Sequence, residues 1–161
     1  AYPDARVTGI DVAAPCLRYA HARAEAQGVA AHFVQANACA TPFADASFDL
    51  IFSSMFLHEL PLKDIRAVFA EAKRLLRPGG LLLHYELPPN GQMEPYDAFY
   101  LDWDSHYNAE PYYRIYRDQD PAELCGAAGF RDFFQAVVPS IGWYGRDAVI
   151  ADAKGGGAVD G

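Results

Sequence analysis

Residues 41–80 read TPFADASFDLIFSSMFLHELPLKDIRAVFAEAKRLLRPGG, and this stretch decides the fold. Residues 47–53 are an apolar run after a turn-prone segment, which predicts a strand buried on both faces of a parallel sheet. Apolar residues then recur at the spacing of a helix that covers one sheet face: Ile65, Val68, Phe69, Ala72, Leu75 and Leu76. Pro78-Gly79-Gly80 predicts the end of this helix, and residues 81–87 predict the next strand. Such a strand–helix–strand unit is typical of α/β folds with right-handed crossovers.

The flanking sequence predicts further elements of the same kind. Residues 6–12 predict a strand that ends in an acid, a helix follows to about Gly28, and residues 32–36 predict a third strand. The C-terminal part predicts a helix over residues 121–128 and strands over residues 130–138 and 147–153. A short connection joins these last two strands, which favours an antiparallel hairpin. The predicted fold class is therefore α/β, with a doubly wound, mostly parallel sheet and an antiparallel C-terminal strand.

Length and composition predict one domain over residues 1–153. The 161 residues are 52% hydrophobic, which is enough apolar material for one sizeable core. No apolar stretch approaches the roughly 20 residues that span a bilayer, and no charged segment before an apolar run indicates a signal peptide. The expected compartment is the cytoplasm. Residues 154–161 are rich in glycine and predict a flexible tail.

Charge and cysteine usage disfavour several function classes. The chain has 21 acidic residues against 13 Lys and Arg, so its net charge of −8 opposes binding to nucleic acid phosphates. Cys16, Cys39 and Cys125 are scattered and odd in number, so neither a disulfide framework nor a metal site is expected.

Asp11 lies where the first predicted strand ends and the chain turns toward a helix. Ligands of open α/β sheets bind beyond the carboxyl ends of the strands. A carboxylate at that position can accept hydrogen bonds from both hydroxyls of a ribose, in an adenosyl cofactor or in NAD. The alternative is an acid that caps the following helix.

The chain resembles the class I S-adenosylmethionine-dependent methyltransferases over about residues 7–87. The resemblance rests on VTGIDVAAPCLRYAHAR around Asp11 and on TPF, SFDL and LRPGG at the family's spacing. The pattern is most similar to small-molecule enzymes of the ubiquinone/menaquinone biosynthesis type, with the methyltransferase type 11 pattern. It implies a Rossmann-like fold and S-adenosyl-L-methionine as the cofactor.

The resemblance also assigns cofactor contacts. It implies that Asp11 binds the ribose and that Asn37 and the backbone after it bind the adenine. The family usually has aspartate at the position of Asn37, and an amide oxygen keeps the hydrogen-bond acceptor while removing the charge. The residues implied to contact the cofactor are Asp11, Val12, Asn37, Ala38, Phe43, Ser53 and Ser54. The alternative for Asn37 is that it only turns the chain, and Asp49 is expected to be structural.

His58 follows the strand over residues 47–53, in the segment that faces the acceptor in the family. It can deprotonate a hydroxyl or amine near neutral pH, although a histidine that only packs there is the alternative. His58-Glu59 does not begin a zinc-binding HExxH motif because residue 62 is Leu. His106 is a second candidate for the base.

Residues 88–119 are rich in aromatic side chains and are the expected place of substrate selection, as an insertion that covers the acceptor. Tyr96, Phe99, Tyr100, Trp103 and Tyr107 recur at helical spacing. This stripe predicts either a lid, whose rings bind a planar substrate or attract a sulfonium, or a helix that packs its apolar face on the sheet. The candidate substrate-binding residues are Phe56, Tyr96, Tyr100, Trp103 and Tyr113.

Only ten residues precede Asp11. The family's glycine-rich turn precedes the ribose acid by roughly twenty residues in comparable dinucleotide folds. We therefore expect a fragment of a longer protein, without the first strand and its glycine-rich loop, that is poorly stable and inactive alone.

The expected reaction is transfer of a methyl group from S-adenosylmethionine to an oxygen, nitrogen or carbon nucleophile of a small molecule. Its partner is that acceptor, with no nucleic acid and no membrane span, and the sequence does not predict the oligomeric state. Two alternatives stay open. An NAD(P)-dependent oxidoreductase would use Asp11 in the same way, and a noncatalytic domain would retain the Rossmann-like fold alone.

Overall fold

The computed structural model describes residues 4–137 and 147–152. The chain divides into two compact units, Ala1–Pro42 and Phe43–Gly161. Each unit contains its own sheet, and their strand orders are β1-β2 and β3-β4-β6-β5. The predicted tail over residues 154–161 and the predicted connection between the last two strands lie outside the described residues.

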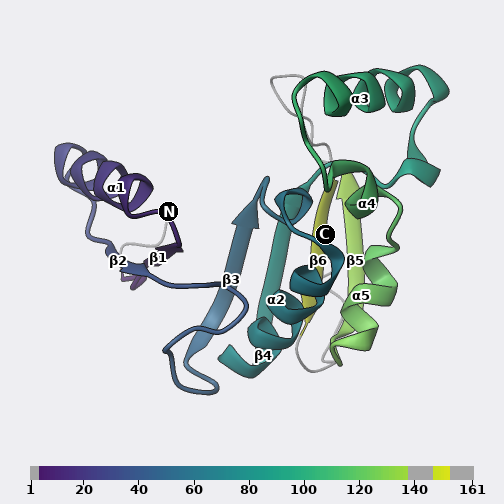
Figure 1. Cartoon of the computed structure of the whole chain (residues 1–161). Coiled ribbons are helices and arrows are strands. Elements are labelled where there is room, and N and C mark those ends of the chain that lie inside the picture. The colour runs from purple at the N-terminus through teal and green to yellow at the C-terminus, as the bar shows by residue number, and fades with distance from the viewer. Residues whose placement is uncertain (1–3, 138–146, 153–161) are drawn as a thin grey trace. The chain divides into compact units, whose positions relative to one another are not determined.

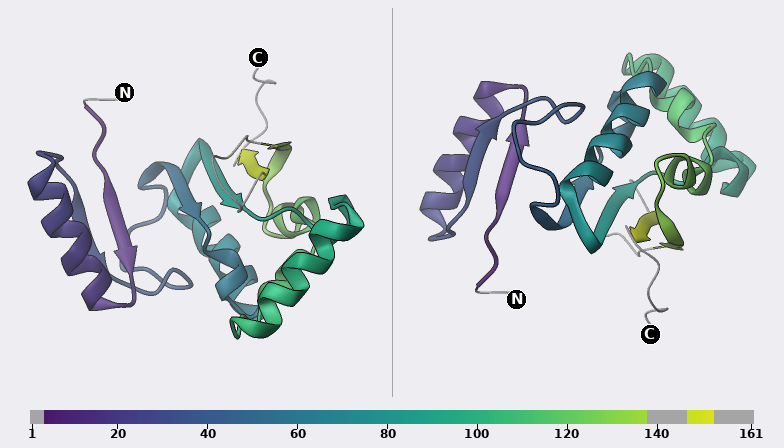
Figure 2. Two further views of the ribbon diagram at one scale, coloured as in Figure 1. Left: turned by 90° about the horizontal axis from the view of Figure 1, so that it is seen from above. Right: turned by 90° about the horizontal axis from the view of Figure 1, so that it is seen from below.

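The first unit is a strand–helix–strand unit. Strand β1 (Thr8–Asp11) pairs in parallel with β2 (His32–Gln35), and helix α1 (Ala14–Ala26) connects them. Figure 2 shows α1 lying along this pair of strands. Gly28 follows α1 with a φ of +66°, a conformation that favours glycine, so it ends the helix as predicted.

The second unit repeats the pattern around a larger sheet. Strand β3 (Phe48–Ser54) pairs in parallel with β4 (Leu76–Glu86), and helix α2 (Leu62–Leu75) connects them. Strand β6 (Asp147–Asp152) pairs antiparallel with both β4 and β5 (Arg131–Val137), and α5 (Pro121–Ala127) precedes β5 (Figure 1). The predicted α/β fold with an antiparallel C-terminal strand is confirmed.

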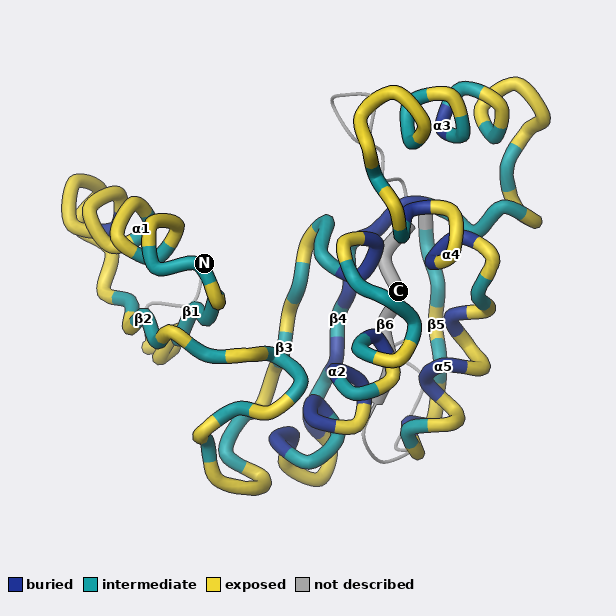
Figure 3. Tube along the Cα trace, viewed as in Figure 1, coloured by how far each residue is buried: buried dark blue, intermediate teal, exposed yellow. Residues whose placement is uncertain are grey.

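The core of the second unit lies between α2, α5 and the sheet. The predicted apolar stripe of α2 is buried, and Ile65 of α2 and Leu82 of β4 are both fully buried. Figure 3 shows buried residues along β4 and on parts of α2 and α5. The prediction that β3 is buried on both faces is wrong, because Leu50 and Phe52 are 52% and 57% exposed. Within the described strands of its sheet, β3 lies at the edge and pairs with β4, and these two alternate residues lie on one face of the strand.

Helix α2 ends earlier than its sequence predicts. Leu76 already has extended backbone, with a φ of −74° and a ψ of 135°, and Pro78, Gly79 and Gly80 lie inside β4. The residue before a proline is disfavoured in a helix, so the turn must end before Arg77. At Gly80 a Cβ would lie 2.9 Å from the carbonyl oxygen of Arg77, and glycine avoids that contact.

Three shorter elements and one longer helix complete the second unit. The 3-10 helix η1 (Leu57–Glu59) follows β3, and a second one, η2 (Asn90–Gln92), follows β4. Helix α3 (Pro95–Tyr107) confirms the helical spacing of the aromatic residues, and the five-residue α4 (Tyr113–Arg117) follows it. These four elements lie at the end of the sheet where β3 and β4 finish (Figure 1).

Candidate functional site

Asp11 closes the turn between β1 and α1. Its Oδ1 accepts a hydrogen bond from the backbone N–H of Ala13 at 2.7 Å. Ala13 is the N-cap residue of α1, and no side chain caps this end of the helix. Gln35 of β2 donates to the carbonyl oxygen of Val12 at 2.8 Å, which ties the ends of the two strands together. Asp11 therefore stabilises the turn that leads into α1 without being its N-cap residue. A carboxylate can also accept hydrogen bonds from ribose hydroxyls.

Asn37 forms the corresponding turn after β2. Its Oδ1 accepts from the backbone N–H of Cys39 at 2.8 Å, and its carbonyl oxygen accepts from that of Ala40 at 3.0 Å. Ala38 is part of this turn. The amide oxygen that the resemblance assigns to adenine thus also holds the loop. Because β1 and β2 are parallel neighbours, the turns of Asp11 and Asn37 lie at the same edge of this sheet.

Phe43 lies in the loop that leads into β3. This loop is held by Arg74, near the end of α2, and by Arg77, near the start of β4. The ring of Phe43 packs edge-to-face on Phe48 with a centroid distance of 5.1 Å. Arg74 donates to the carbonyl oxygen of Phe43 at 2.9 Å and also pairs with Glu71 and Asp45. A second ion pair joins Arg77 to Asp49 at 2.6 Å, which agrees with a structural role for that aspartate.

Ser53, near the end of β3, binds a buried histidine of the neighbouring strand. Its Oγ lies 2.5 Å from Nδ1 of His84, which is 1% exposed. Burial lowers the pKa of His84 to about 4, so this imidazole is neutral at physiological pH. Ser54 is exposed, and Met55 has a φ of +50°, a left-handed conformation that turns the chain out of the strand.

His58 is held by Glu86, a residue that the sequence reasoning missed. Glu86 is the last residue of β4 and is 1% exposed. Its Oε1 accepts from the backbone N–H groups of Phe56 and Leu57, both at 2.6 Å, and its Oε2 lies 2.8 Å from Nδ1 of His58. One buried carboxylate therefore fixes three consecutive residues after β3. Glu86, like Asp11, is an acid at the carboxyl end of a parallel strand. The same sequence signal could therefore have identified it.

The charges around His58 favour its protonated form. Burial alone lowers the pKa of His58, but the hydrogen bond and charge of Glu86, with the charges of Glu59 and Glu110, outweigh burial and raise it above 6.5. Nε2 of His58 lies 3.5 Å from Oε1 of Glu59, whose side chain is 55% exposed. The imidazole is thus oriented through Nδ1, and Nε2 is the nitrogen left for another partner.

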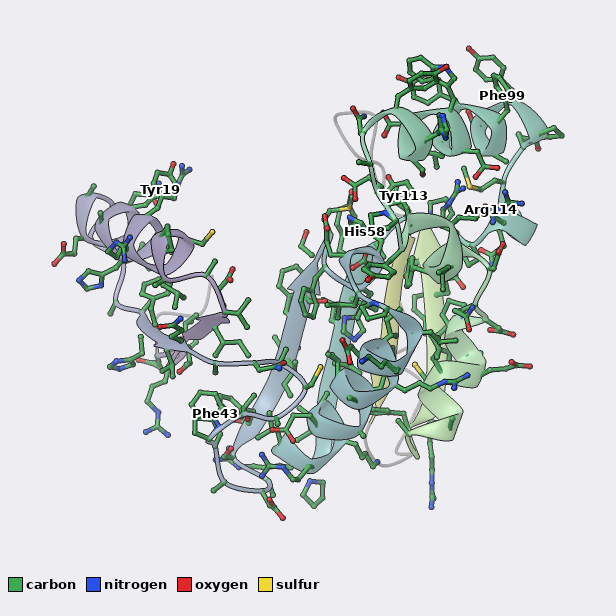
Figure 4. The ribbon with its side chains drawn as sticks, in the orientation of Figure 1. Tyr19, Phe43, His58, Phe99, Tyr113 and Arg114 are labelled. Atoms are coloured by element: carbon green, nitrogen blue, oxygen red, sulfur yellow. The ribbon has the colours of Figure 1, made fainter. Side chains whose placement is uncertain are left out.

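Tyr113 and Arg117 of α4 continue this cluster. The ring of Tyr113, 3% exposed, packs edge-to-face on the His58 ring with a centroid distance of 4.9 Å. The Arg117 guanidinium lies over the same tyrosine ring at 5.5 Å from its centroid. Figure 4 shows His58 and Tyr113 close together beneath α3. Of the candidate substrate residues, Tyr113 is thus brought next to His58, while Phe56 contributes its backbone N–H to Glu86.

The aromatic stripe of α3 lies largely in solvent. Tyr96, Phe99 and Trp103 are 75%, 67% and 48% exposed, and the Phe99 side chain points away from the sheet (Figure 4). The alternative in which this face packs on the sheet is wrong for these exposed residues, and the buried residue of α3 is Leu101. The Tyr100 ring lies 6.1 Å from that of Trp103. His106 is also exposed, and its ring packs on Tyr107.

Metal-binding clusters and membrane-spanning helices are both absent from the described part of the chain. Within residues 4–137 and 147–152, no group of three or more His, Cys, Asp or Glu side chains is placed to hold a metal ion. Among the same residues, none of the helices has both the length and the apolar character needed to cross a membrane.

Comparison with known proteins gives a consistent family. Residues 1–80 match a family described as a methyltransferase domain. The chain is 38% identical over 87 residues to the demethylmenaquinone methyltransferase of Thermus thermophilus, covering 54% of this chain and 39% of that protein. It is 34% identical over 131 residues to the malonyl-[acyl-carrier protein] O-methyltransferase of Hahella chejuensis, covering 81% of this chain and 44% of that protein. The chain thus spans less than half the length of these curated relatives.

Solved structures show the same fold. A SAM-dependent methyltransferase of Methanosarcina mazei superposes with a TM-score of 0.68 at 24% identity, covering 91% of this chain and 81% of that one. At this identity the likeness supports the Rossmann-like architecture and says nothing of the substrate.

Proposed function

Because the chain belongs to the class I S-adenosylmethionine-dependent methyltransferases, we propose that the protein transfers a methyl group from S-adenosylmethionine to a nucleophile of a small-molecule acceptor. The acceptor atom is an oxygen, nitrogen or carbon. The two relatives described above have names with different acceptors, demethylmenaquinone and malonyl-[acyl-carrier protein], so the acceptor must be inferred from the site.

The turns after β1 and β2 fit the adenosyl part of the cofactor. Asp11 offers a carboxylate for the ribose hydroxyls, and Asn37 and Ala38 offer an amide and a backbone N–H for the adenine, at one edge of one parallel sheet. For Phe43, Ser53 and Ser54 the proposed role in cofactor binding rests on the family resemblance. When bound, the cofactor supplies an already activated methyl group, so the protein mainly has to align the acceptor and exclude water.

The observation that supports the proposed acceptor site is the set of contacts that Glu86 makes with residues 56–58. It fixes the segment after β3 at the carboxyl end of two parallel strands, where ligands of such sheets bind. Since Nδ1 of His58 faces Glu86, we assign proton acceptance from the acceptor to Nε2. Glu59 lies 3.5 Å from that nitrogen, and its exposed side chain can rotate away. His106 is exposed on α3 and stays a second candidate.

The experiment that tests this function is calorimetric titration of S-adenosylhomocysteine. Asp11→Ala is expected to weaken binding at least about tenfold, a loss of about 1.4 kcal/mol. Asp11→Asn keeps an oxygen for Ala13 and removes the charge, so it separates ribose binding from loss of the turn. Asp4→Ala is the matched control, an exposed aspartate before β1. Binding by Asp11→Ala and Asp11→Asn that equals the unmodified protein would contradict the proposal.

The oxidoreductase alternative is tested in the same samples. It predicts that NADH binds and that its fluorescence changes on addition of protein. S-adenosylhomocysteine binding without any NADH response supports methyl transfer. NADH binding that depends on Asp11, with no binding of S-adenosylhomocysteine, would favour the oxidoreductase.

A further inference from the structure

Arg117 is a fully buried cation with few acceptors around it. Its side chain is 0% exposed, and Nη2 donates to Oδ1 of Asp102 in a short ion pair. Nη1 faces the sulfur of Met93 at 3.8 Å, and Nε has no hydrogen-bond partner among the described residues. A guanidinium carries five N–H donors, and a buried charge is costly unless it is paired. One carboxylate therefore balances Arg117, and part of its donor capacity is unused.

The carboxylate that balances Arg117 belongs to helix α3. Asp102 is 43% exposed, and it lies on α3, where Leu101 is the buried residue. Leu101 packs in a small cluster with Leu87 and Tyr113. The ion pair and this cluster hold α3 on the second unit. Movement of α3 away from this cluster would separate Asp102 from Arg117 and leave the N–H donors of the guanidinium accessible.

The Tyr113 ring lies between Arg117 and His58, the proposed base. Tyr113 contacts both the His58 imidazole and the Arg117 guanidinium, with centroid distances of 4.9 Å and 5.5 Å. An acceptor whose reacting atom is near His58 would thus have Arg117 within the length of a small molecule.

The negative charge around Arg117 bears on which ligands it can bind. Residues 88–119 contain six acids and two arginines, and the whole chain has a net charge of −8. An anionic ligand is repelled by most of this surface, so it needs a dedicated cation. Arg114, the other arginine of the segment, is exposed, whereas a buried guanidinium binds a carboxylate strongly and in a defined orientation.

We propose that Arg117 binds a carboxylate group of the methyl acceptor and that Asp102 occupies the same place until the acceptor arrives. The exchange replaces one carboxylate by another, so Arg117 is paired both before and after the acceptor binds. This inference rests on the proposed function and names its substrate class, a small acceptor that carries a carboxylate.

The test uses two carboxylates and their neutral counterparts as probes. Succinate, benzoate, succinamide and benzamide are titrated by calorimetry into the protein saturated with S-adenosylhomocysteine. We expect the two carboxylates to bind and the two amides not to bind. Asp102→Asn removes the internal competitor, so it should raise carboxylate affinity about tenfold, which is about 1.4 kcal/mol. Arg117→Met should abolish the binding.

Matched variants separate this role from a structural ion pair. Asp97→Asn makes the same charge change at an exposed position of α3 and should leave carboxylate affinity unchanged. Arg117→Lys keeps the charge without the planar fork and should retain only part of the affinity. If Asp102→Asn does not raise the affinity, or if the carboxylates bind Arg117→Lys as tightly as the unmodified protein, the pair only holds α3 and the inference is wrong.

Binding of S-adenosylhomocysteine is measured first in every variant. These titrations use the full-length protein to which this chain belongs. If the unmodified full-length protein does not bind S-adenosylhomocysteine, the proposed function fails and the inference fails with it. If all variants bind it but carboxylate affinity does not depend on Arg117, only the inference fails.

Discussion

Replacing Glu86 by glutamine tests whether its negative charge, rather than its shape, organises the segment after β3. Glutamine has the same size and keeps one oxygen, which can still accept from the N–H groups of Phe56 and Leu57. The second oxygen becomes an NH2 group that faces Nδ1 of His58, where the native contact is 2.8 Å. The variant therefore loses one buried, charge-assisted hydrogen bond and weakens two others.

The expected cost follows from these contacts. A hydrogen bond to a charged group contributes roughly 1.5–3 kcal/mol, so Glu86→Gln should lower the free energy of unfolding by about 2 kcal/mol. Glu86→Ala leaves three donors without an acceptor and should cost about 3–5 kcal/mol, as for other broken buried pairs. Glu59→Gln is the control, because Glu59 also faces His58 but is 55% exposed, and it should cost less than about 1 kcal/mol.

The pH dependence provides a second readout. The pKa of His58 is raised in the folded protein, so its pairing with Glu86 stabilises fully below the unfolded value of 6.5. That stabilisation is lost as pH rises through the folded pKa. Urea unfolding of the two proteins should therefore differ most near pH 6 and less near pH 8. NMR titration of His58 should show a lower pKa in Glu86→Gln.

The reasoning would be refuted by two results. One is an unfolding free energy of Glu86→Gln within about 0.5 kcal/mol of the unmodified protein at pH 6, the size of an ordinary surface change. The other is a His58 pKa that falls as much in Glu59→Gln as in Glu86→Gln, because the exposed acid would then dominate the charge at His58.

Two further predictions concern buried titratable groups. Burial lowers the pKa of His84 to about 4, so stability should fall as pH drops from 6.5 toward 4; urea unfolding of His84→Gln should show a smaller fall over that range. Burial, with the charge of Asp120, raises the pKa of Cys125 to about 12, so in native protein a thiol reagent should label exposed Cys16 well before Cys125. Mass spectrometry of the labelled peptides checks this order, and early labelling of Cys125 would mean that α5 opens readily.

The sequence predicted those features that depend on local periodicity. The stripe of α2 has helical spacing and is buried, and the turns at Gly28 and after Asp11 are set by residues a few positions apart. The end of α2 was predicted too late, because Pro78-Gly79-Gly80 was assigned to a helix stop although it lies within β4. Periodicity does not distinguish a bend within a strand from the end of a helix.

The contacts around the segment proposed to face the acceptor depend on strand register and could not be predicted in this way. Glu86 and His58 are 28 residues apart, and their contact requires β3 and β4 to pair with Ser53 opposite His84. The aromatic stripe of α3 was predicted by its spacing, but spacing defines a face without saying what it contacts. The Arg117 pair depends on how a five-residue helix is oriented, for which the sequence has no periodic signal.

Two side chains of strand β4, those of His84 and Glu86, hold the end of β3 and the segment after it. His84 and Glu86 are two residues apart, so their side chains lie on the same face of the strand, and both are 1% exposed. His84 binds Ser53 within β3, and Glu86 binds the three residues that follow Met55. The segment proposed to face the acceptor is thus fixed by two buried side chains. Among the described residues, the contacts that attach α3 include the packing of Leu101 and the ion pair of Asp102 with Arg117. Methyl transfer requires alignment of donor and acceptor, and acceptor entry requires an opening. The segment after β3, held by two side chains of β4, would supply the alignment. Movement of α3 would supply the opening.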